Sequence, residues 1–124
     1  MHLLRLPGRK NCDRVRVKGA LWKGKHLNVR WLAGSPYHLS EKPSAPAIYV
    51  GVLSSTKLDK SAVKRNRMRR RCREALRLTV AKRPDPAVAD RSLQLLLLPR
   101  SSSLGCTFNE LSDEVSRFLS SVHL

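Results

Sequence analysis

Apolar and polar side chains alternate along residues 20–32. Leu27, Val29 and Trp31 are separated by single polar residues, and this period of two places all three on one face of a strand. A Lys-Gly-Lys turn signal at residues 23–25 precedes them. The pattern therefore predicts two strand segments joined by a turn.

Two further segments are nearly continuous apolar runs of strand length. They are residues 47–53 (AIYVGVL) and residues 92–98 (SLQLLLL), the second ended by Pro99. Such runs are typical of strands that are buried on both faces. Residues 34–46, between the strand segments, contain three prolines together with Ser, Gly and Glu, and predict an exposed loop.

Three segments have apolar residues spaced by three and four positions, which gives a helix one buried face. Residues 10–18 are a weak candidate with a partial face, ended at Gly19. Residues 61–81 contain neither glycine nor proline, and their buried stripe is expected to consist of Met68, Cys72, Ala75, Leu76, Thr79 and Val80. Thr107 and Glu110 have the spacing of a capping box, and the helix they begin has an apolar face made of Phe108, Leu111, Val115, Phe118, Leu119 and Val122.

The order of these elements predicts a single α+β domain over residues 1–124, built as a two-layer sandwich of sheet and helices. A chain of 124 residues suits one domain, because two separate cores of half that size would each be marginal. Residues 1–8 and 34–46 are expected to be flexible parts of that domain.

The charge of the chain narrows the class of partner. It has 25 Lys and Arg against 9 Asp and Glu, a formal net charge of +16, while 41% hydrophobic residues support a packed core. Self-repulsion at this charge disfavours a compact state, and a polyanionic partner relieves it. Nucleic acid is the commonest partner of this kind, with an anionic membrane surface second. No apolar run approaches the roughly 18 residues of a membrane span, so no segment is expected to span a bilayer, and nucleic acid rather than a membrane is the expected partner.

The cysteines indicate a compartment. Cys12, Cys72 and Cys106 are odd in number and form no Cys-x-x-Cys pair, which argues against a zinc site or a disulfide framework. Residues 1–9 lack the apolar run and cleavage site of a signal peptide. These features predict a protein of the reducing cytoplasm.

The strongest functional signal is the basic run in the second predicted helix, where seven of the ten residues at positions 64–73 are Lys or Arg. Most of them lie opposite the apolar stripe. Arg69, Arg73 and Arg77 recur every four residues, so their guanidinium groups are expected to follow one phosphate track. Only Glu74 offsets their mutual repulsion. Because arginine suits bidentate phosphate recognition, this one-signed face favours nucleic-acid binding over an ordinary solvated helix face.

This helix resembles the signature of the bacterial ribonuclease P protein. Residues 61–77 read SAVKRNRMRRRCREALR. The family pattern is Ala-Val-x-Arg-Asn-Arg, an apolar residue, a Lys or Arg and an Arg, followed by Arg-Glu and a further Arg. Gly51 and Lys57 match the glycine and lysine that lead into it. Length and element order extend the resemblance to nearly the whole chain.

The resemblance implies a subunit of an enzyme whose catalytic centre is RNA. Ribonuclease P removes the 5′ leader of precursor tRNA, and its RNA subunit works with bound magnesium. The implied partners are the RNase P RNA subunit and precursor tRNA; the implied cofactor is magnesium held mainly by the RNA, and no further protein partner is required. Carried over residue by residue, the RNA-binding set is Lys57, Lys60, Lys64, Arg65, Asn66, Arg67, Arg69, Arg70, Arg73 and Arg77.

The resemblance also implies a fold and a cleft. The fold is α-β-β-β-α-β-α with a left-handed βαβ crossover through the basic helix, although general statistics favour the right-handed one. The single-stranded leader binds between sheet and helices, where the family has an aromatic residue and this chain has Cys12, with Arg16 one turn later. Stacking on an aromatic ring contributes about 1–3 kcal/mol per base, so we expect weaker or more electrostatic leader binding here. Trp31 and Tyr49 are alternative stacking residues, although a plain core role is the favoured interpretation.

The remaining chemistry-bearing residues form no catalytic set in the sequence. The nine acidic residues are scattered and the four histidines are isolated, with no motif that would hold two metal ions about 3.5–4 Å apart. Glu110, Asp113 and Glu114 are expected to complement the dipole of the last helix. We therefore expect the protein alone not to cleave RNA.

Two other functions would also use a strongly basic helix. A ribosomal or other structural RNA-binding protein is the alternative, and it explains the charge but not the Arg-Asn-Arg pattern. A dimeric DNA-binding basic helix is disfavoured, because no leucine heptads follow Arg77 and Pro84 ends the helix.

Overall fold

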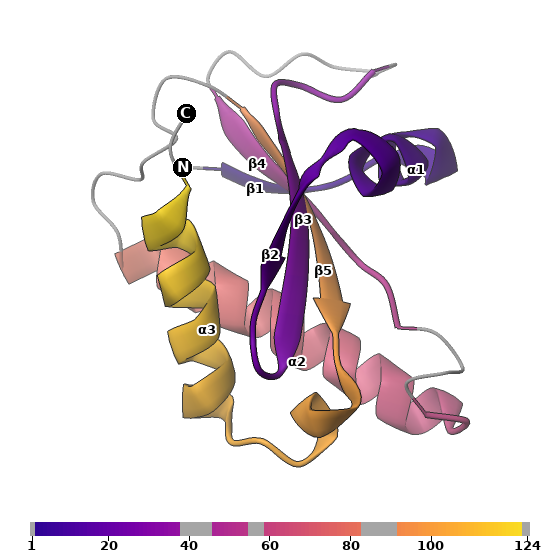
Figure 1. The fold of residues 1–124 in the computed structure, drawn as a ribbon, viewed down its shortest axis with the longest axis vertical. Coiled ribbons are helices and arrows are strands. Elements are labelled where there is room, and N and C mark those ends of the chain that lie inside the picture. Colours follow the sequence, from indigo (N-terminus) through magenta and orange to yellow (C-terminus); the bar gives the residue numbers. More distant parts are fainter. Residues whose placement is uncertain (1, 38–45, 55–58, 83–91, 123–124) are drawn as a thin grey trace.

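The structure is a computed structural model that describes residues 2–37, 46–54, 59–82 and 92–122. This part of the chain forms one sheet with helices packed on it (Figure 1). In chain order its elements are β1 (His2–Arg5), α1 (Gly8–Lys18), β2 (Ala20–Lys23), β3 (Leu27–Ala33), β4 (Ala47–Val52), α2 (Ala62–Lys82), β5 (Leu93–Pro99), the short 3-10 helix η1 (Ser101–Leu104) and α3 (Phe108–Ser121).

The sheet has the strand order β1-β4-β5-β3-β2. β1, β4 and β5 are parallel neighbours, whereas β3 pairs antiparallel with both β5 and β2. The predicted α+β class and strand segments are confirmed, and α2 joins the parallel neighbours β4 and β5 as a crossover. The left-handed sense of that crossover stays a prediction.

The first strand corrects an expectation from the sequence. Residues 1–8 were expected to be flexible, yet residues 2–5 pair with residues 47–50 in β4 and form one edge of the sheet. The backbone N–H of Leu6 also donates to the carbonyl oxygen of Val50 over 2.9 Å, so the connection to α1 is held in place. Four residues are too few to show a periodicity, and their parallel partner lies more than forty residues away in the chain.

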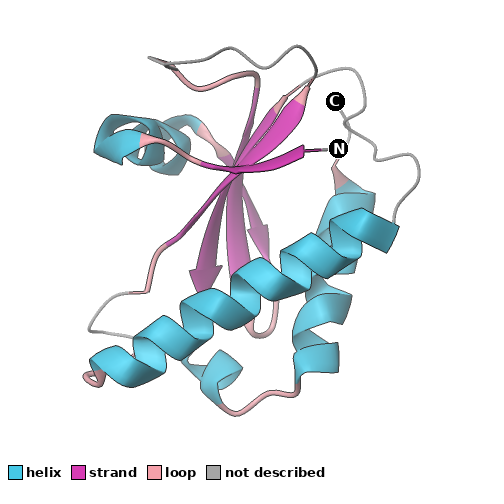
Figure 2. Cartoon of the chain, turned by 180° about the vertical axis from the view of Figure 1, so that it is seen from behind, coloured by secondary structure: helices cyan, strands magenta, loops and turns pink. Residues whose placement is uncertain are grey.

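Side chains from the sheet form a core on each of its faces. α2 and α3 cover one face, where Val29, Ile48 and Leu95 belong to the larger buried cluster. α1 covers the other face, where Val15, Tyr49 and Leu96 belong to the smaller one. Figure 2 shows α2 running across the sheet beside α3, while α1 lies apart from both. The sheet is therefore covered on both faces, and α1 adds a third layer to the predicted two.

The start of the 34–46 loop is also ordered by specific contacts. The Asn11 side chain donates to the Tyr37 carbonyl oxygen and accepts from the Tyr37 N–H, each over 3.0 Å. The backbone N–H of Gly34 donates to the carbonyl oxygen of Ser92 over 2.8 Å. Residues 34–37 are thus tied to α1 and β5, which the loop composition did not predict, and residues 38–45 lie outside the described residues.

The β2–β3 turn is fastened to α3 by buried polar groups. Both carboxylate oxygens of Glu114, which is 1% exposed, accept from the backbone N–H of His26 at 3.0 Å. The His26 ring lies 3.1 Å from Glu110, whose carboxyl pKa is lowered, first by the backbone hydrogen bond from Thr107 and then by His26. Thr107 and Glu110 form the predicted capping box. The expectation that His26 is isolated was wrong, because its ring contacts Glu110, and the contact of Glu114 with the β2–β3 turn was not predicted from the sequence.

Candidate nucleic-acid interface

α2 begins where its sequence predicts. The side-chain oxygen of Asp59 accepts from the Ser61 N–H over 2.7 Å, and the Ser61 hydroxyl accepts from the Lys64 N–H over 3.3 Å. Side-chain oxygens thus satisfy N–H groups that the first turn of a helix leaves unpaired. The predicted apolar stripe, from Met68 to Val80, is the buried face of the helix. Its opposite face is therefore turned to solvent.

Most of the predicted RNA-binding side chains lie on this solvent face. The exposed ones on α2 are Lys64, Asn66, Arg67, Arg70, Arg73 and Arg77, and Lys60 is exposed just before the helix. Arg65 is half-buried, and its guanidinium group donates to the carbonyl oxygens of Asp59 and Lys60 over 2.9 and 3.1 Å. Arg65 thus also holds the start of α2. Lys57 lies outside the described residues.

The expected track of Arg69, Arg73 and Arg77 needs a correction. Arg69 is half-buried and donates to the side-chain oxygen of Asn66. Arg70 instead joins Arg73 and Arg77 along one side of the helix, where all three line a groove beside β1. Leu76, two turns after Arg69, is fully buried, so Arg69 lies at the margin of the buried stripe.

Arg71 has a different task from its basic neighbours. Its guanidinium group donates to the carbonyl oxygens of Ser103 and Cys106 over 3.2 and 2.7 Å. These carbonyls belong to η1 and the turn before α3. Arg71 therefore joins α2 to the C-terminal part of the fold, a role that the uniform basic run conceals.

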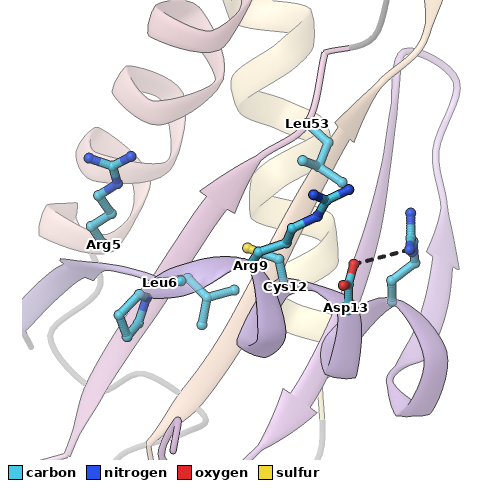
Figure 3. Close-up of a pocket in the computed structure, with 9 residues that line it drawn as sticks. Arg5, Leu6, Arg9, Cys12, Asp13 and Leu53 are labelled. Atoms are coloured by element: carbon cyan, nitrogen blue, oxygen red, sulfur yellow. Dashed lines mark hydrogen bonds and ion pairs between the residues drawn. The ribbon is translucent and has the colours of Figure 1, made fainter. Parts of the chain in front are cut away.

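A cavity of about 730 Å³ lies between α1 and the start of the chain. Figure 3 shows Arg9, Cys12 and Asp13 along α1, with Leu53 reaching the cavity from beyond β4. The lining residues are Arg5, Leu6, Pro7, Gly8, Arg9, Cys12, Asp13, Arg16 and Leu53. Its lining thus combines arginine side chains with apolar ones, and Arg16 is paired with Asp13 over 3.0 Å.

The structure separates the four residues that the sequence assigned to the leader cleft. Cys12 and Arg16 line the α1 cavity together. Tyr49 is only 2% exposed in the core under α1, and Trp31 packs against the core on the opposite face of the sheet. Neither residue lines the cavity; Tyr49 belongs to a core and Trp31 is partly buried against the other one, which favours the core interpretation of both.

Gly51 was matched to the family only as a strand glycine. A methyl group at this position would contact Leu96, the Cys12 sulfur and Leu6, so Gly51 lies next to two residues that line the cavity. Arg5, Arg9 and Leu53 were not predicted as cavity residues. A basic residue on a short edge strand carries no local signal that it will meet a helix.

Comparisons with known proteins decide the family. The sequence profile described as Ribonuclease P matches residues 2–123. The chain belongs to the Ribonuclease P protein family.

Individual relatives agree with this assignment. The Ribonuclease P protein component of Rickettsia canadensis is 33% identical over 72 residues, which cover 58% of each chain. That of Thermus scotoductus is 40% identical over 75 residues, 60% of this chain and 38% of its own. These matches therefore span less than two thirds of the relatives' length. The RNase P protein from Thermotoga maritima has the same fold, with a TM-score of 0.73 at 14% identity, covering 97% of this chain and 98% of that one.

The described residues of this family member offer no fitting place for a metal ion. No group of three His, Cys, Asp or Glu side chains that could hold a metal ion is found in residues 2–37, 46–54, 59–82 and 92–122. No helix within those ranges is long and apolar enough to cross a membrane.

The Cys12 thiol in the cavity wall has a raised pKa. Burial is the larger cause, and the negative charge of Asp13 raises the pKa further. Cys12 is thus a neutral, weakly polar part of the cavity wall rather than a thiolate nucleophile.

Proposed function

We propose that this protein is the protein subunit of ribonuclease P, which binds the catalytic RNA and assists endonucleolytic removal of the 5′ leader from precursor tRNA. The observation that carries the proposal is the exposed face of α2. Arg67, Arg70 and Arg73 project from it with Lys64 and Arg77, and Glu74 is its only acidic residue. Such a face binds phosphates and releases their counterions, which is the main source of affinity for RNA.

The α1 cavity is proposed to receive the leader. It is lined by arginines for the phosphates and by Leu6, Cys12 and Leu53 for the bases. It lies on the other face of the sheet from α2, since α1 packs on the smaller core. The protein can therefore hold the catalytic RNA on one face and the leader of its substrate on the other.

The chemistry of cleavage is assigned to the RNA. No group of three His, Cys, Asp or Glu side chains that could hold a metal ion is found among the described residues, and we place magnesium on the RNA partner. The protein's own residues bind and orient the two RNAs. Its net charge of +16 lowers the repulsion between these polyanions. The proposal places the protein in the cytoplasm, with no membrane and no further protein partner.

Leader binding in the cavity leads to a prediction for Cys12. Replacing Cys12 with Phe should tighten binding of precursor tRNA, because a ring that extends into an open cavity can stack on a leader base. The expected gain is at most about 1–3 kcal/mol, less any strain from the larger ring. Binding is measured for precursor and mature tRNA. The control is Val17→Phe, which adds a ring on α1 at a position 76% exposed and outside the cavity. Equal effects of the two variants on precursor tRNA would contradict the assignment.

The alternative of a ribosomal or other structural RNA-binding protein is tested by RNA choice. Purified protein is titrated into labelled RNase P RNA in the presence of excess ribosomal RNA fragments of similar size. We expect binding to RNase P RNA to persist under this competition. If an equal mass of ribosomal RNA displaced the protein from RNase P RNA, this result would support the structural RNA-binding alternative and contradict the proposal.

A further inference from the structure

A second groove of about 730 Å³ lies between the edge strand β1 and α2. Arg5 on β1 faces Arg70, Arg73 and Arg77 on α2 across it. In Figure 3 the Arg5 side chain extends away from Cys12 toward the helix. The groove is thus separate from the α1 cavity, although Arg5 lines both.

The polar walls of the groove carry a net positive charge. Four arginines and one glutamate line it. Glu74 is paired with Arg77 through both carboxylate oxygens, and this contact lowers the pKa of the Glu74 carboxyl. Because Glu74 is paired with Arg77, this one acidic side chain of the groove does not compete with an anionic ligand for the other arginines. Arg5, Arg70 and Arg73 are exposed, and no ion pair is found for them among the described residues.

The floor of the groove is apolar. Leu3 and Arg5 stand on the same face of β1, because side chains alternate along a strand. Their partners in β4 are Ile48 and Val50, which belong to the core that α2 covers. Leu3, Leu4 and Val50 are the apolar residues that line the groove, and Val50 is only 6% exposed. The outer edge of β1 has no strand partner in the described sheet, so its backbone N–H and C=O groups are available as donors and acceptors.

We propose that this groove binds one unpaired nucleotide of the RNA partner, with its phosphate among Arg5, Arg70 and Arg73 and its base over Leu3 and Val50. An anionic group joined to a flat apolar ring matches both the walls and the floor. A paired nucleotide cannot present its base in this way, because its base is stacked in the duplex. A second copy of the chain that added a strand to β1 would bring a net charge of +16 against the arginines.

The inference rests on the proposed function and extends its RNA surface from α2 to β1. It is tested with RNase P RNA containing 4-thiouridine in one preparation and 6-thioguanosine in another, crosslinked to the wild-type protein by light. We expect adducts on peptides that contain Leu3–Arg5 or Val50. Arg5→Ala should lower their yield and reduce the log–log salt slope of binding by roughly 0.7 to 0.9, the value of one phosphate contact.

The control is Arg117→Ala, which removes one exposed arginine from α3 and should change neither quantity. Adducts confined to α1 and the far side of α2, with an unchanged slope for Arg5→Ala, would overturn the inference. If Arg5→Ala changed the oligomeric state, measured by light scattering, but left RNA binding unchanged, the β1 edge would be assigned to a second copy instead. Failure of the wild-type protein to bind RNase P RNA would contradict the proposed function itself, so the two failures are distinguishable.

Discussion

Replacing Arg67, Arg70 and Arg73 together with alanine is expected to lower the salt dependence of RNase P RNA binding more than any other change of equal charge. Each lost phosphate contact lowers the log–log slope by roughly 0.7 to 0.9, so the triple variant should lose about two to three units. All three side chains are exposed, and the buried stripe of α2 is left untouched. The fold should therefore persist, which circular dichroism checks.

The matched control removes the same charge from another surface. Lys23 and Lys25 beside the β2–β3 turn and Arg117 on α3 are also exposed. Replacing these three with alanine lowers the net charge equally but leaves α2 intact. We expect its slope to stay close to that of the wild type. Equal losses in both triple variants would show that RNA responds to total charge rather than to the face of α2.

The second large effect separates two adjacent arginines. Arg70→Ala should lower the slope of RNA binding by roughly 0.7 to 0.9 and leave the free energy of unfolding nearly unchanged. Arg71→Ala should lower the free energy of unfolding and leave the slope of RNA binding nearly unchanged. It removes charge-assisted hydrogen bonds to the Ser103 and Cys106 carbonyls, which costs about 1.5–3 kcal/mol.

Urea denaturation and salt titration of RNA binding measure the two effects on the same preparations. Arg71→Lys should recover only part of the stability, because one ammonium group cannot reproduce the planar fork of a guanidinium group. An Arg71→Ala variant with wild-type stability and a reduced slope would place Arg71 on the RNA surface and contradict the structure.

The sequence was informative where the signal is local. The α2 stripe, the Thr107–Glu110 capping box and the apolar strands depend on spacings within a few turns, and each was found close to its predicted place. The basic face was also predicted, because its residues are consecutive. The family signature then extended the prediction from a helix to a function.

The sequence was uninformative where a contact joins distant segments. β1 is recognisable only by its pairing with β4. In the sequence nothing distinguishes Glu114 from the other acidic residues of the last helix, although its side chain accepts from a backbone N–H eighty-eight residues away. Arg71 differs from Arg70 only in the direction it takes from the helix. The composition of a run cannot reveal which of its members turns toward another element.

The measurement that tests the central claim most directly is the initial rate of leader release from precursor tRNA at low magnesium concentration. It compares the RNase P RNA alone, the protein alone, and the RNA with wild-type protein or with the Arg67, Arg70 and Arg73 triple variant. We expect no cleavage by the protein alone, a clear increase when wild-type protein joins the RNA, and little or no increase with the triple variant. Leader release by protein freed of RNA, or equal stimulation by the wild type and the triple variant, would contradict the account.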